Sequence, residues 1–145
     1  MKKRKDFSNL EMHDLFKKAF TKLNDLFKEG DYFKAFILAF SILEDRVTAT
    51  CKTYFALMDL NEKIVEIPFS LRKKAKLLLL TGLLDKKDYD SLCRIADNRN
   101  TFYHAYFLGD FAIDKKDVKE IIRLIRVADK KQNVQKTKLR RVSNK

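Results

Sequence analysis

The sequence contains very little glycine and proline, with three Gly and one Pro among 145 residues. Tight turns depend on these two residue types, so a β-sandwich or a barrel with many hairpins is nearly excluded. No apolar run approaches the ~18 residues that a membrane-spanning helix needs. The basic residues 2–5 are followed by no apolar stretch of the kind that marks a signal peptide. We therefore expect a soluble cytoplasmic protein that has no contact with a membrane.

Cysteine and histidine are also scarce, with two residues of each. Two cysteines, Cys51 and Cys93, cannot form a disulfide framework, and neither lies in a metal-binding CxxC pattern. No His, Cys and carboxylate residues cluster at the spacing of metal ligands, and no glycine-rich phosphate loop is present. We therefore predict neither a metal site nor a cofactor. Cys51 lies on an apolar stripe and is expected to be a small core residue.

The net charge of +12 is concentrated at the two ends of the chain. Segment 1–5 carries four basic residues and segment 130–145 carries seven, with no acidic residue in either, so 6–129 is nearly neutral. We divide the chain into two basic tails and a helical bundle over 6–129, and expect neither tail to pack on the bundle. Such tails either neutralise RNA phosphates or are inert, solubilising ends. The tail residues assigned to RNA binding are Lys2, Lys3, Arg4, Lys5, Lys136, Lys138, Arg140 and Arg141.

Helix start and stop signals divide the bundle into segments. Ser8 and Glu11 form a capping box, and Gly30 is suited to end the helix that they begin. Residues 35–43 are apolar on almost every side, which is typical of a helix surrounded by other helices. The pattern predicts an all-α, four- or five-helix up-and-down bundle with a long central second helix. The later segments are expected at Asp31 to Met58, Ser70 to Gly82, Lys86 to Tyr106, and from Asp114 onward.

Arg99 projects from the apolar side of the fourth predicted helix. A rotation of about 100° per residue places it near the centre of the arc that also holds Leu92 and Ile95. An unpaired guanidinium is too costly to bury in a dry core. Arg99 therefore either pairs with a carboxylate, for which Glu44 and Asp45 are the candidates, or lies on a face that opens into a cleft or a partner interface.

The sequence RNTFYH at 99–104 resembles the R-x(4–6)-H motif of the HEPN superfamily, including the polar residue that often follows the arginine. The motif comes late in the fourth helix, behind a long apolar second helix that carries LEDR at 43–46, which is similar to the layout of that family. The resemblance covers about residues 8–128 in layout. It implies a metal-independent endoribonuclease, often a toxin or defence component, that acts as a homodimer with both motifs in one cleft. An antitoxin or another protein is a possible partner.

The residues of the motif are suited to the chemistry that the resemblance implies. His104 can act as general base towards a ribose 2′-OH or as acid towards the leaving oxygen. Arg99 can bind the scissile phosphate, and Asn100 can orient the imidazole or the phosphate. Attack by the 2′-OH makes RNA the substrate and leaves a 2′,3′-cyclic phosphate. The supporting residues are Glu44, Asp45 and Tyr103.

Helix geometry restricts how Arg99 and His104 can meet. Five residues rotate a helix by about 500°, so the two side chains point about 140° apart. They converge only if the helix loosens near Tyr103, if the arginine curls round, or if two chains complete one site. The main alternative is a non-catalytic HEPN-like module that binds a protein or nucleic-acid partner, with Arg99 in a structural ion pair. Another is a small nucleic-acid-binding protein that binds through its basic tails.

Overall fold

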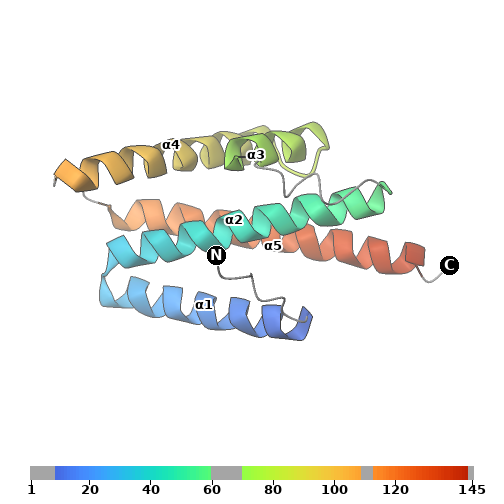
Figure 1. The fold of residues 1–145 in the computed structure, drawn as a ribbon, viewed down its shortest axis with the longest axis horizontal. Helices are drawn as coiled ribbons and strands as arrows, with labels where there is room; N and C mark the ends of the chain where they lie inside the picture. Colours follow the sequence, from blue (N-terminus) through green and yellow to red (C-terminus); the bar gives the residue numbers. More distant parts are fainter. Residues whose placement is uncertain (1–8, 60–69, 109–112, 144–145) are drawn as a thin grey trace, which may run out of the picture.

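The chain folds into five α-helices in a computed structural model that describes the backbone of residues 9–59, 70–108 and 113–143 and the side chains of 14–59, 70–101 and 113–142. No strand occurs in these ranges. The predicted all-α bundle is therefore confirmed (Figure 1). None of the helices, over the same ranges, is long and apolar enough to cross a membrane. The helices are α1 (Asn9–Glu29), α2 (Tyr32–Leu57), α3 (Leu71–Leu80), α4 (Lys86–Leu108) and α5 (Lys115–Ser143).

The helix ends follow the local signals in the sequence. Asp31 and Ser70 cap α2 and α3, and each side chain accepts a hydrogen bond from the backbone N–H three residues later, at 3.2 and 3.3 Å. Asp114 and Asp117 satisfy each other's backbone N–H groups at the start of α5. Gly30 ends α1 with a φ of 79°, which a residue with a Cβ rarely adopts. Ser8, expected to cap α1, lies outside the described residues.

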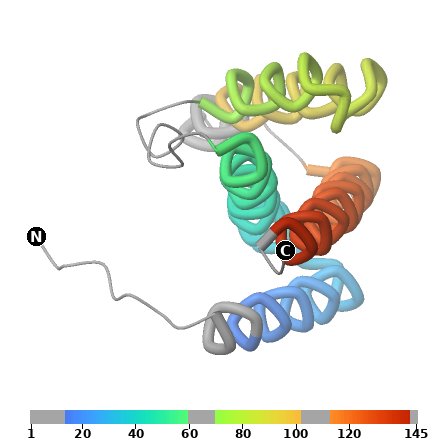
Figure 2. The backbone as a smooth tube through the Cα atoms, turned by 90° about the vertical axis from the view of Figure 1, so that its right-hand side faces the viewer, coloured from blue at the N-terminus to red at the C-terminus, as the bar shows by residue number. Residues whose placement is uncertain are grey.

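The five helices form three layers. Helices α2 and α5 lie side by side in the middle layer, with α1 on one side and α3 and α4 on the other (Figures 1 and 2). Helix α2 contacts α1, α3 and α5, which confirms its central place. Helices α2, α3 and α5 run in one direction and α1 and α4 in the other (Figure 1). Directions therefore alternate along the chain except between α2 and α3.

The core lies mainly between α2 and α5. Small side chains on α2, such as Ala35 and Ala39, are fully buried and leave room for close helix packing. Thr50 is 1% exposed, and its hydroxyl donates to the backbone carbonyls of Arg46 and Ala128. This polar group in the core is therefore satisfied and also ties the two central helices together. The largest fully buried apolar side chains are Leu23, Leu43, Val47, Val118, Ile121, Leu124 and Ile125.

The basic segment 130–145 differs from the tail expected from its charge. Helix α5 continues without a break to Ser143, so the boundary after residue 129 falls inside a helix. Gln132 and Gln135 are each 5% exposed, and the Gln132 Oε1 accepts a hydrogen bond from Arg46 at 3.2 Å. The expectation that this segment does not pack on the bundle is wrong for these two glutamines. Both residues are polar, and the partner of Gln132 is far away in the sequence, so an apolar stripe does not reveal their burial.

Cys51 is the core residue that the sequence predicts, with 2% of its surface exposed. Burial raises the pKa of its thiol to about 12, so the reactive thiolate is absent near neutral pH. We expect iodoacetamide at pH 8 to alkylate the half-buried Cys93 in the native protein and Cys51 only in denaturant. Peptide mass spectrometry distinguishes the two sites, and a Cys93→Ser variant is the control. Native alkylation of Cys51 at the rate of a free thiol would contradict its burial.

Candidate phosphate-binding cleft at Arg99

Arg99 is held between a carboxylate and an aromatic ring of α2. Its Nη1 lies 3.0 Å from the Oε1 of Glu44, and its guanidinium carbon lies 4.5 Å from the centre of the Phe40 ring. The side chains of Arg99 and Glu44 are 38% and 41% exposed, so the pair lies at the surface and not in a dry core. Of the two acceptors expected, Glu44 is the one used. Asp45 instead binds Arg46, at 2.6 Å.

The Arg99 pair lines a cleft of about 260 Å³ between α2, α3 and α4. Two more cations, Arg72 and Lys74, line the same cleft, whereas Glu44 is the only carboxylate among the described residues that do so. Asn100 is exposed and also lies on the lining. The cleft is therefore positively charged and open to solvent. Its other lining residues are Phe40, Ser70, Leu71 and Ala96.

Hydrogen bonds hold Arg72 and Lys74 in place and connect α3 to α2 and α4. Arg72 donates to Asp97 of α4 at 2.5 Å, and this bond raises the pKa of Arg72. The Nζ of Lys74 donates to the hydroxyl of Thr48 on α2 at 2.8 Å. Helix α3 thus presents Arg72 and Lys74 at the cleft from a position set by both α2 and α4.

His104 and Tyr103 belong to α4, but their side chains lie outside the described residues. The backbone of α4 is helical from Lys86 to Leu108, so it does not loosen near Tyr103. His104 therefore lies about 7.5 Å further along the axis than Arg99 and is rotated by about 140°. The Arg99 side chain points to Glu44 on α2.

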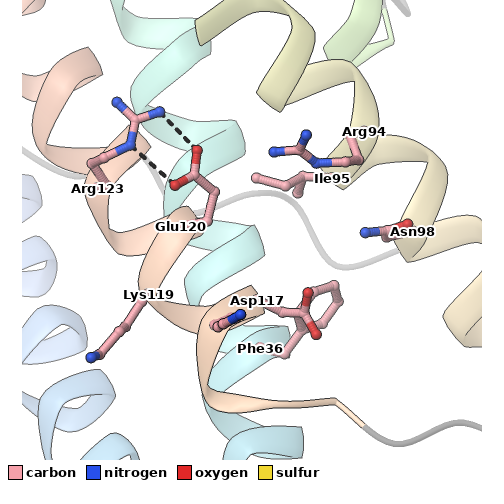
Figure 3. Close-up of a pocket in the computed structure, with 9 residues that line it drawn as sticks. Phe36, Arg94, Ile95, Asn98, Asp117, Lys119, Glu120 and Arg123 are labelled. Carbon is pink, nitrogen blue, oxygen red and sulfur yellow. Dashed lines mark hydrogen bonds and ion pairs between the residues drawn. The ribbon is translucent and has the colours of Figure 1, made fainter. Parts of the chain in front are cut away.

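A second cavity, of about 450 Å³, lies between α4 and α5 (Figure 3). Beside it, Arg123 binds both Glu120, at 2.7 Å, and Asp88, at 2.8 Å. The guanidinium lowers the pKa of Glu120 and keeps this carboxylate charged. This network is not among the residues predicted from the sequence. Asp88 lies four and seven residues before Leu92 and Ile95, on the same buried face of α4. An acidic residue on an apolar helix face was the sequence signal that could have indicated a buried ion pair.

The basic residues assigned to the tails fall into two groups. Lys2, Lys3, Arg4 and Lys5 lie outside the described residues. Lys136, Lys138, Arg140 and Arg141 are exposed on the last turns of α5. In the described part of the chain, no group of three or more His, Cys, Asp or Glu side chains is placed to hold a metal ion.

Comparison with known proteins assigns no family: no family model, no curated protein and no solved structure matches this chain. The resemblance to HEPN proteins therefore depends on the motif at 99–104 and on the helical layout. The geometry of the Arg99 cleft is independent of that resemblance.

Proposed function

We propose that the chain is a HEPN-like, metal-independent endoribonuclease in which Arg99 binds the scissile phosphate. The observation that supports this is the placement of the Arg99 guanidinium, fixed by Glu44 and Phe40 in a solvent-open cleft beside Arg72 and Lys74. A cation oriented before the substrate arrives stabilises developing negative charge without further reorganisation. Its planar donors match the oxygens of a phosphodiester.

The proposed reaction is an internal transfer that needs no external nucleophile. His104 accepts the proton of a ribose 2′-OH, whose oxygen attacks the adjacent phosphorus, while Arg99 stabilises the charge on the phosphate oxygens. The P–O5′ bond breaks, the leaving oxygen takes a proton from solvent water, and a 2′,3′-cyclic phosphate remains. Asn100 lies on the same cleft and orients the phosphate. The regular helix between Arg99 and His104 favours a two-fold dimer in which each site takes one residue from each chain.

Cleavage of single-stranded RNA in excess EDTA tests this proposal. The wild type should cleave and leave cyclic phosphate ends, whereas His104→Ala should lose at least about 100-fold in rate, as expected for loss of a general acid–base group. His13→Ala removes the only other histidine and should retain activity. Equal cleavage by all three preparations would identify a contaminating nuclease and overturn the proposal, as would no cleavage by the folded wild type.

A second candidate, a non-catalytic HEPN-like binding module, is favoured by the same ion pair. A guanidinium that already has a carboxylate partner on the neighbouring helix also has a structural role. In that case neither the wild type nor any of the variants would cleave RNA. Arg99→Ala and Glu44→Gln would each lower the free energy of unfolding. Because the pair is exposed, we expect a loss of no more than about 1 kcal/mol.

A further inference from the structure

Helix α5 carries most of the excess positive charge of the chain. Its residues Lys115–Ser143 include eleven basic and three acidic side chains, a net charge of +8 against +12 for the whole sequence. Apart from Arg123, which pairs with Asp88 and Glu120, a rotation of about 100° per residue places five of the basic residues within an arc of about 80°, and all three acids fall outside it. We call these five the α5 basic stripe: Lys115, Lys119, Arg126, Lys130 and Arg141. The stripe extends about 39 Å along the helix.

The stripe is exposed, and its charge is not neutralised by acidic neighbours. None of its five side chains forms an ion pair with the residues that the structure describes. The acid Glu120 faces Arg123 instead, and Lys119 extends away from α4 towards α1 (Figure 3). Arg123 is itself neutralised by this pairing and is left out of the stripe.

Aromatic rings of α1 position two of the stripe cations. The Nζ of Lys115 lies 5.6 Å from the centre of the Phe27 ring, and the guanidinium of Arg126 lies 6.0 Å from the centre of the Phe20 ring. Cations placed over ring faces lose less side-chain freedom when an anion binds. The α1 side of the stripe is therefore partly ordered in advance.

A groove follows the stripe along the surface. A cavity of about 590 Å³ between α1 and α5 is lined by Asn24, Lys119, Arg126 and Lys130 over an apolar floor. Arg126 and Lys130 also line the next cavity, of about 390 Å³, together with Asn133, Thr137 and the acidic Asp129, whose carboxylate lies 3.7 Å from Arg46 of α2. The two cavities thus share the same cations, and the polar side chains between them can bind phosphate or ribose oxygens.

We propose that the α5 basic stripe and its groove bind the sugar–phosphate backbone of RNA, without reading its sequence. A row of unpaired cations with amide and hydroxyl groups is complementary to a polyanion that carries regularly spaced phosphates. A lipid surface is disfavoured because the apolar side of α5, including Ile121 and Ile125, is buried against α2. The choice of RNA over DNA rests on the proposed function.

The stripe is a separate surface from the Arg99 cleft, because it faces α1 whereas the cleft lies where α2 meets α3 and α4. It also differs from the tail assignment made from charge alone. Lys136 and Lys138 lie outside the 80° arc and should contribute little, although they are exposed on the same helix.

Two triple variants with the same change in charge test the stripe in a His104→Ala background, which keeps the RNA intact. One carries Lys119→Gln, Arg126→Gln and Lys130→Gln. The control carries Lys131→Gln, Lys136→Gln and Lys138→Gln, all exposed and off the stripe. Fluorescence anisotropy measures the Kd for a labelled 20-nucleotide single-stranded RNA between 50 and 200 mM KCl, and circular dichroism confirms that each variant is folded.

We expect the stripe triple to raise the Kd at least about tenfold and to reduce the slope of log K against log salt by about 2, since three phosphate contacts are lost. The control triple should change the Kd less than about threefold. Equal losses in the two triples, or no RNA binding by the parent, overturn the proposal. Binding to anionic phosphatidylserine vesicles in place of RNA also overturns it. Because binding is measured without cleavage, failure of the ribonuclease proposal is seen separately in the EDTA assay.

Discussion

A mixture of Arg99→Ala and His104→Ala chains should cleave RNA, although neither chain should do so alone. Helix α4 is regular from Lys86 to Leu108, so Arg99 and His104 leave its backbone about 140° apart, and Arg99 is directed to Glu44, which favours the proposed site shared between two chains. In a two-fold dimer of the two variants, one of the two composite sites keeps both residues. Random pairing makes half of the dimers mixed, so the mixture should recover about a quarter of the wild-type rate.

The rate of formation of cyclic phosphate ends measures this recovery. The matched control replaces the His104→Ala chain with a double Arg99→Ala, His104→Ala chain, whose mixed dimers contain no intact site. Light scattering should give about twice the chain mass of 17.2 kDa for every preparation. If folded, dimeric and freely exchanging chains recover no cleavage, the composite site is wrong.

Ending the chain after Asp129 should lower the free energy of unfolding by about 3 kcal/mol and the unfolding temperature by roughly 10 °C. The deletion removes the last turns of α5, including Gln132 and Gln135, which are buried on the bundle. The deletion also removes the Gln132 Oε1 that accepts a hydrogen bond from Arg46 of α2. Urea unfolding followed by circular dichroism gives the change.

Two variants separate lost packing from lost charge. Gln132→Ala keeps the helix but removes one of the partners of Arg46, and should lower the free energy of unfolding by about 1 to 2 kcal/mol. The triple Lys131→Gln, Lys136→Gln, Lys138→Gln removes three charges from exposed positions and should change stability by less than about 0.5 kcal/mol. An unchanged urea midpoint in the truncated chain would mean that this part of α5 adds nothing to the fold.

The parts of the fold that depend on local chemistry could be predicted from the sequence. Asp31 and Ser70 form their cap hydrogen bonds within three residues, and Gly30 ends α1 through its own backbone conformation. The course of α5 beyond residue 129 could not be predicted in this way. Its burial depends on Gln132 meeting Arg46, which is 86 residues away and has no local signal.

The residues of the candidate site could be predicted from the sequence, but the contacts between them could not. Periodicity placed Arg99 on an inward face and left Glu44 and Asp45 as equal acceptors. The structure uses Glu44 because it lies one turn after Phe40, on the side of α2 that faces the Arg99 guanidinium. Asp45, rotated by about 100°, binds Arg46 instead.

The pairing of Glu44 with Arg99 has a consequence for ligand selection. The guanidinium already has an anionic partner 3.0 Å away, tethered to α2 at a high effective concentration. An incoming phosphate exchanges one anionic contact for another, so a solitary inorganic phosphate or free mononucleotide gains little by entering. A long strand that is also anchored elsewhere on the bundle brings its phosphates to the cleft at a comparably high effective concentration. If the proposed RNA binding holds, we expect the Glu44 carboxylate to disfavour abundant small anions at this cleft relative to polymers.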